Sequence, residues 1–124
     1  MSKTVSFVIE GRLPSMNDFI GAMNANRWKG AKLKKDETRR CALAASVLKP
    51  INSPVSLSIA WIERDCRRDI DNVSSGGIKV LMDGLVTAGI LKDDSRRWVR
   101  SILHTFPEPD KANPRVEVTI IEHE

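Results

Sequence analysis

Two aspartates separated by a single residue, Asp69 and Asp71, are the part of the sequence best suited to chemistry. On an extended strand the side chains alternate with period two, so both carboxylates would point to the same face. Two carboxylates held that close repel each other, and a cation between them removes the cost. A hard divalent cation such as Mg²⁺ takes oxygen ligands, so the pair predicts a metal site. The alternative is two solvated acids at a strand end, one of which caps the following helix.

A second acidic pair, Asp93 and Asp94, follows the helix expected after Asp71. The two ends of that helix are about 24 Å apart, at 1.5 Å per residue. Asp94 can therefore join Asp69 and Asp71 only if the chain turns after the helix and runs back along it. The alternative is an exposed turn that carries two acids.

A lysine, Lys79, lies in the second turn of the same expected helix. Its ammonium group could hold a phosphate or an attacking water as a point charge. The alternative is a solvated lysine that pairs with Asp83 one helical turn later.

Basic side chains flank both acidic pairs and also form a run around Trp28. Acidic residues flanked by basic residues suggest a metal site that acts on a polyanion. The basic groups would contact the phosphates of this polyanion without recognising a base sequence. The alternative is a set of solvated surface charges. The candidate phosphate contacts are Arg27, Lys29, Lys32, Lys34, Lys35, Arg67, Arg68, Arg96 and Arg97.

The composition limits the classes of protein that fit. The 124 residues are expected to form a single domain over 1–124, and the net charge of +4 is compatible with nucleic-acid binding. No apolar stretch approaches the roughly 20 residues of a membrane span, and the first residues lack the apolar run of a signal peptide. We expect a cytoplasmic protein with no membrane partner and no organic cofactor. Cys41 and Cys66 match no zinc spacing and are expected to be packing or surface thiols.

Hydrophobic periodicity predicts an α+β fold, with one small mixed β-sheet and two α-helices packed on one face. Helical spacing predicts one helix over 36–48 and another from Asn72 to Ala88. Leu13 to Asp18 is expected to be a loop, because its residues favour turns. Gly76 and Gly77 indicate a bend or the close approach of another backbone. Alternating apolar residues predict strands over 5–10 and 55–62, and two further strands are expected over 97–106 and 115–121.

Taken together, several motifs resemble the RusA-type Holliday junction resolvases. The similarity spans nearly the whole chain, in the right order and at the right length. The early Leu13-Pro14-Ser15-Met16-Asn17 resembles the Pro-Ser-Asn loop of that family. The motifs in the second half are Arg68-Asp69-Ile70-Asp71-Asn72, Lys79, Asp83-Gly84-Leu85, Gly89-Ile90-Leu91 and Asp93-Asp94.

The resemblance implies a small homodimer that cleaves four-way DNA junctions with Mg²⁺, or with Mn²⁺ in its place, during DNA recombination and repair. Such enzymes are often encoded by phages or prophages. The family's essential acids match Asp69, Asp71 and Asp94, which would be both catalytic and metal-binding, and its essential lysine matches Lys79. Some members have that lysine four residues after the second aspartate, where this chain has Ser75. Lys79 keeps the same facing if the stretch 74–77 is one inserted helical turn.

Two alternatives to this function stay open. One is a non-catalytic protein that binds branched DNA, which needs the basic surface but not the acids. The other is a metal-dependent nuclease that acts on forks, flaps or RNA.

Overall fold

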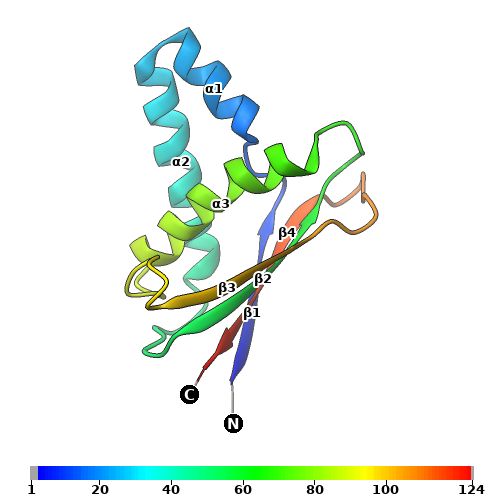
Figure 1. Cartoon of the computed structure of the whole chain (residues 1–124). Coiled ribbons are helices and arrows are strands. Elements are labelled where there is room, and N and C mark those ends of the chain that lie inside the picture. Colours follow the sequence, from blue (N-terminus) through cyan, green and yellow to red (C-terminus); the bar gives the residue numbers. More distant parts are fainter. Residues whose placement is uncertain (1–2, 124) are drawn as a thin grey trace.

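The computed structural model describes residues 3–123, which form four strands and three helices (Figure 1). The α+β class is confirmed, whereas the expected number of two helices is too low. The strands are β1 (Thr4–Glu10), β2 (Val55–Ile62), β3 (Val99–Thr105) and β4 (Arg115–Glu122). The helices are α1 (Met16–Ala25), α2 (Arg27–Ala45) and α3 (Ile70–Thr87).

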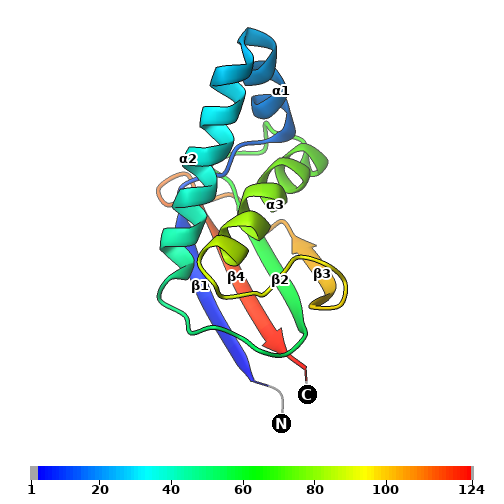
Figure 2. The same ribbon diagram turned by 90° about the vertical axis from the view of Figure 1, so that its left-hand side faces the viewer.

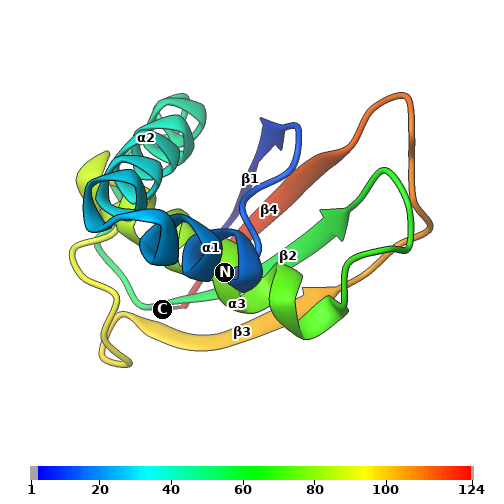
Figure 3. The same cartoon turned by 90° about the horizontal axis from the view of Figure 1, so that it is seen from above.

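The four strands form one mixed sheet in the order β1-β4-β2-β3. Strand β4 is antiparallel to both of its neighbours, and β3 is parallel to β2. Two parallel neighbours need a crossover connection, which α3 supplies by passing over them (Figure 3). The chain therefore leaves β2 at one end of the strands and starts β3 at the opposite end, beside the start of β2.

The core lies between the helices and one face of the sheet. In Figure 2, α2 and α3 stand in front of the strands. Alternate residues of β1, β2 and β4 are buried on that side, which is the expected period-two pattern, whereas β3 buries only Val99. The buried strand residues are Phe7, Ile9, Val55, Leu57, Ile59, Trp61, Val99, Val116, Val118 and Ile120, with Ile62 buried as well at the end of β2.

Two adjacent glycines let α3 pack directly on its neighbours. A Cβ at Gly76 would lie 2.3 Å from the backbone carbon of Ser15, and a Cβ at Gly77 would lie 2.4 Å from the ring of Trp61. Contacts that short do not occur between real atoms, so both positions exclude larger residues. The expected close approach of another backbone is thus confirmed at Gly76, and α3 continues through both glycines.

Helix α1 begins inside the segment that was expected to be a loop and includes its last three residues, Met16 to Asp18. The Ser15 hydroxyl accepts a hydrogen bond from the backbone N–H of Asp18 at 3.2 Å. The Asp18 carboxylate in turn accepts from the backbone N–H of Ser15 at 2.9 Å. This reciprocal arrangement is a capping box, which satisfies two donors at the helix start. Polar residues that favour turns therefore begin a helix here.

The two cysteines are the ordinary thiols that the sequence predicted. Cys41 is buried on α2, and this burial raises the pKa of its thiol to about 12, while Cys66 is exposed. Over residues 3–123, no helix combines the length and the apolar character needed to cross a membrane.

Candidate functional site

The first acidic pair lies at the beginning of α3 and not on a strand. Asp69 is the N-cap residue, with extended backbone angles, and Asp71 lies in the first helical turn. The argument from strand periodicity was therefore wrong, although both side chains are exposed at the same end of one helix. The Asp69 carboxylate makes no capping hydrogen bond. It is thus available to a ligand, in a position where the helix dipole favours negative groups.

The neighbouring Arg68 holds this end of α3 in place. Its guanidinium donates to both carboxylate oxygens of Glu63, at 2.6 and 2.8 Å. It also donates to the Leu13 carbonyl at 3.1 Å and lies 3.3 Å from the Asp18 carboxylate. Because each guanidinium nitrogen of Arg68 donates to a protein group, Arg68 has no nitrogen left for a phosphate. Arg68 therefore positions the site, and its expected role as a phosphate contact is not supported.

The second acidic pair lies at the opposite end of α3. The loop that carries it is fixed to the start of β2 by two backbone hydrogen bonds, from Ile51 N–H to the Ile90 carbonyl and from Val55 N–H to the Trp98 carbonyl. Asp69 instead follows the far end of β2, which is seven residues or about 23 Å away at 3.3 Å per residue. The chain does run back as β3, but only after Asp94. Within a single chain, Asp94 is therefore not close to Asp69 and Asp71.

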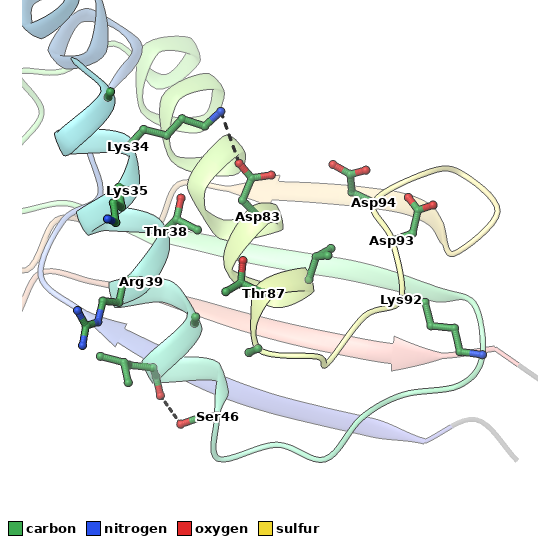
Figure 4. A pocket seen from close by; sticks show the side chains of 15 residues that line it. Lys34, Lys35, Thr38, Arg39, Ser46, Asp83, Thr87, Lys92, Asp93 and Asp94 are labelled. Atoms are coloured by element: carbon green, nitrogen blue, oxygen red, sulfur yellow. Dashed lines mark hydrogen bonds and ion pairs between the residues drawn. The ribbon is translucent and has the colours of Figure 1, made fainter. Parts of the chain in front are cut away.

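Asp94 instead lines a groove of about 1090 Å³ between α2 and the last turns of α3 (Figure 4). Basic side chains of α2 form the opposite wall, and Lys34 reaches across to Asp83 at 3.8 Å. The charged residues that line the groove are Lys34, Lys35, Arg39, Asp83, Lys92, Asp93 and Asp94. Arg39 and Lys92 were not among the sequence candidates. The helical spacing of Lys35 and Arg39 would have indicated a shared face if α2 had been predicted to start at Arg27.

Lys79 is exposed on α3 at the spacing that places it on the side of Asp71. Asp71, Ser75 and Lys79 follow one another at intervals of four residues, which is one helical turn each. Along the helix axis Lys79 is about 12 Å from Asp71, and its side chain leaves the backbone toward the helix start. The alternative pairing with Asp83 is not formed, because the Asp83 carboxylate faces Lys34.

The remaining basic candidates are solvent-exposed and only weakly engaged. Lys32 pairs with Asp36 at 2.7 Å, and Arg67 lies 3.9 Å from Asp65. Exposed pairs of this kind contribute little to stability, so they can be exchanged for contacts with a ligand at small cost. Arg27, Lys29 and Lys35 are exposed on α2, and Arg96 and Arg97 are exposed in the turn before β3.

Histidine chemistry does not contribute to this site. The Trp61 indole N–H donates to Nδ1 of His104 at 2.9 Å, and the two rings stack with centroids 5.9 Å apart. An indole nitrogen can only donate, so Nδ1 of His104 is an acceptor. Burial lowers the pKa of His104, which favours the same neutral ring. His104 is thus a structural partner of the core tryptophan.

Within the described residues, no three side chains of histidine, cysteine, aspartate or glutamate are grouped so that they could share a metal ion. No protein-family model matches the chain, and no curated protein matches its sequence.

Proposed function

We propose that this protein is a Mg²⁺-dependent endodeoxyribonuclease for branched DNA, with four-way junctions as its substrate and DNA recombination or repair as its setting. The observation that carries the proposal is the pair of exposed carboxylates at the start of α3, with Asp69 free of any capping role. Mg²⁺ is usually bound through one or two protein carboxylates, with water and substrate phosphates completing its coordination. Two aspartates at a rigid helix end fit this requirement, and Mn²⁺ accepts the same oxygen donors.

Some residues of the chain would bind the ion and the DNA, and others would neutralise charge on the reacting phosphate. Asp69 and Asp71 would hold the ion at a position fixed by the Arg68 contacts to Glu63 and Leu13. When bound, the ion would activate a water molecule and offset charge on the phosphodiester. Lys79 would reach back along α3 toward the same phosphate and stabilise the negative charge that builds up there. Arg67, Arg96, Arg97 and the basic residues of α2 would hold the flanking phosphates.

We propose that the third acid comes from a second copy of the chain. Asp94 follows the far end of α3, which is about 26 Å long. If a two-fold axis sets two α3 helices side by side in opposite directions, Asp94 of the partner subunit approaches Asp69 and Asp71. Such a homodimer has two equivalent sites, which suits the paired cuts that a four-way junction needs.

Exposed apolar side chains beside the start of α3 support a partner on this side. Ile70 and Phe106 line one small cavity there, and both are exposed, as is Ile102 on β3. Strand β3 is also an edge of the sheet, where unpaired backbone groups are open to another chain. A second copy that covers this side would remove the apolar groups from water.

The test of the proposal compares four labelled substrates: a four-way junction, a fork, a flap and a plain duplex, each with Mg²⁺ and with EDTA. We expect nicking of the junction that requires Mg²⁺ and is lost in Asp69→Asn and Asp71→Asn, while junction binding persists. Glu10→Gln removes an exposed acid from β1, at the edge of the sheet opposite β3, and serves as the matched control. Normal cutting by either aspartate variant would exclude the metal assignment.

The same experiment separates the second candidate, a non-catalytic protein that binds branched DNA. This candidate is favoured by the basic wall of the α2–α3 groove, which needs no metal to hold phosphates. Junction binding without Mg²⁺-dependent nicking would identify it. Preferential cutting of the fork or the flap would instead reassign the substrate.

A further inference from the structure

Residues 16–35 form a helical hairpin that projects beyond the sheet at the end opposite the two termini (Figures 1 and 2). Its two helices, α1 and the first half of α2, are joined by the single residue Asn26. The Asn26 backbone N–H closes α1 by donating to the Ala22 carbonyl at 3.2 Å, and its side chain caps α2 by accepting from Lys29 N–H at 2.8 Å. Gly30 lies against Met23 so closely that a Cβ there would be 2.5 Å from the Met23 side chain. The hairpin is therefore a rigid projection.

The hairpin carries the net charge of the whole protein. Residues 16–35 contain five basic residues and one acidic residue, which gives +4. The remainder of the chain has fifteen basic and fifteen acidic residues, so it is neutral. The single acid, Asp18, is held at the base of the hairpin by Ser15 and Arg68. The charged side chains of residues 27–35 are thus all basic, and one of them, Lys32, is paired with Asp36 in the next turn.

An exposed tryptophan lies among these basic residues. Trp28 is 76% exposed in the first turn of α2, and the Arg27 guanidinium lies 5.7 Å from its ring centroid. Trp28, Lys32, Lys35 and Arg39 follow at intervals of four, three and four residues, which places them on one face of the helix. The stripe is about 17 Å long, or the length of about five stacked nucleotides at 3.4 Å each. At its far end Lys35 and Arg39 enter the groove that contains Asp94.

We infer that Trp28 stacks on an unpaired base of a DNA strand, and that Lys35 and Arg39 contact the phosphates of that same strand as it runs toward the groove. The inference rests on the proposed function in that the ligand is DNA with unpaired bases, as found at a branch point. An exposed aromatic ring beside basic groups is how proteins bind single strands without sequence preference. A lipid surface is the other partner that tryptophan and lysine can serve. The stripe disfavours a lipid surface, because the positions that follow Trp28 are charged and offer no continuous apolar face that could insert into a membrane.

The experiment measures binding of the intact protein to a fluorescein-labelled oligothymidine in EDTA, so that no cleavage occurs. Trp28→Ala is expected to weaken binding by roughly 5- to 150-fold, the usual effect of losing one stacked base. An oligonucleotide of equal length with abasic sites keeps the phosphates and removes the bases, so Trp28→Ala should leave its binding unchanged. Trp28→Phe should restore most of the affinity for the oligothymidine. Val47→Ala, which trims a side chain of equal exposure outside the stripe, is the matched control.

Salt dependence separates the two parts of the site. Lys35→Ala and Arg39→Ala are each expected to reduce the slope of log affinity against log salt by about 0.7, whereas Trp28→Ala leaves that slope unchanged. Equal losses by Trp28→Ala on the abasic and normal oligonucleotides, or no loss on either, would overturn the inference. So would insertion of Trp28 into vesicles of anionic phospholipid, seen as a blue shift of its emission, with no response to the oligonucleotide. If Trp28-dependent binding is found but Mg²⁺-dependent nicking is not, the proposed nuclease fails and this inference stands.

Discussion

Arg68 and Glu63 form a two-pronged ion pair, with Nε and Nη2 of the arginine donating to the two carboxylate oxygens at 2.6 and 2.8 Å. Both side chains are largely buried, at 17% and 13% exposure. The pair joins the end of β2 to the residue before Asp69. Because the same guanidinium also holds the Leu13 carbonyl, three segments that are distant in sequence depend on it.

We expect Arg68→Gln to lower the free energy of unfolding by about 3 kcal/mol, because the buried Glu63 carboxylate loses both of its arginine hydrogen bonds and keeps only the more distant Arg12 at 3.9 Å. Arg67→Gln alters the adjacent arginine, which is exposed, and should leave the stability within about 0.5 kcal/mol of the original. Urea denaturation of the two variants measures this difference. Equal stability of the two variants would remove Arg68 from its structural role and return it to the set of candidate phosphate contacts.

Gly76→Ala is expected to destabilise the protein by about 2 kcal/mol, although alanine favours helices. The new methyl group would overlap backbone atoms of Pro14, Ser15 and Met16, which cannot move aside cheaply. Gly21→Ala is the control, because it also lies inside a helix but has nothing within 4 Å of the added carbon. That variant should gain about 0.5–1 kcal/mol. Thermal melting of both variants checks the prediction, which fails if their melting temperatures shift in the same direction.

Mixing two inactive variants tests whether the site is shared between subunits. If Asp94 acts on the partner's Asp69 and Asp71, a heterodimer of Asp69→Asn and Asp94→Asn subunits has one intact site. After subunit exchange, about one quarter of the original nicking activity should return, since half of the dimers are mixed and each has one site. The cuts should be single nicks and not paired ones. Continued inactivity in a mixture shown to contain heterodimers would indicate that the second subunit does not complete the site.

Lys79→Ala should lower nicking of the junction by about 100-fold, because a group that stabilises charge only in the transition state is lost. The affinity for the junction in EDTA should change little. Lys111→Ala removes another exposed lysine, in the loop before β4, and should not affect turnover. Single-turnover rates at saturating enzyme distinguish the two variants, and a normal rate for Lys79→Ala would return that residue to the ordinary surface lysines.

Stability should decline in mild acid because of His104. Its folded pKa lies below the ordinary value of 6.5, so the unfolded chain takes up a proton at a higher pH than the folded one. The stabilising contribution of the neutral ring is therefore complete above pH 6.5 and is lost as the pH falls through the lower folded value. Unfolding free energies measured between about pH 5 and pH 8 should fall more steeply for the original protein than for His104→Gln. Parallel profiles would show that protonation of His104 does not oppose the Trp61 hydrogen bond.

Strands β1, β2 and β4 were predicted closely from the sequence because each has one buried face, and burial imposes alternation on the sequence. Strand β3 buries only Val99 and has no such pattern. The helix expected over 36–48 began nine residues too late for a related reason, since α2 starts at Arg27. The first half of α2 lies on the projecting hairpin, where few side chains are buried, so no apolar periodicity marks it as a helix. Helix α1 was hidden by Ser15 and Asp18, whose capping interactions use the same residue types as a turn.

The acidic residues of the site remain a prediction from the sequence, and their mutual placement could not be predicted from it. Asp69 has the extended backbone of a strand residue while it occupies the N-cap position of α3 without a capping hydrogen bond, so the local sequence fits both a strand and a helix start. The position of Asp94 depends on where the loop after α3 is tied to the start of β2. The hydrogen bonds of Ile51 and Val55 that fix it join residues about forty apart in the chain, beyond the range of any local pattern.

A protein whose excess charge sits entirely on one projecting end, and whose body is neutral, has a large electric dipole moment. In the electric field of a polyanion such a molecule rotates as it approaches, so most encounters begin with the hairpin facing the polyanion. Productive collisions become more frequent at low ionic strength, while the rate of departure is set by the short-range contacts made afterwards. Asn26, the one residue between the two helices, thus lies at the point of first approach.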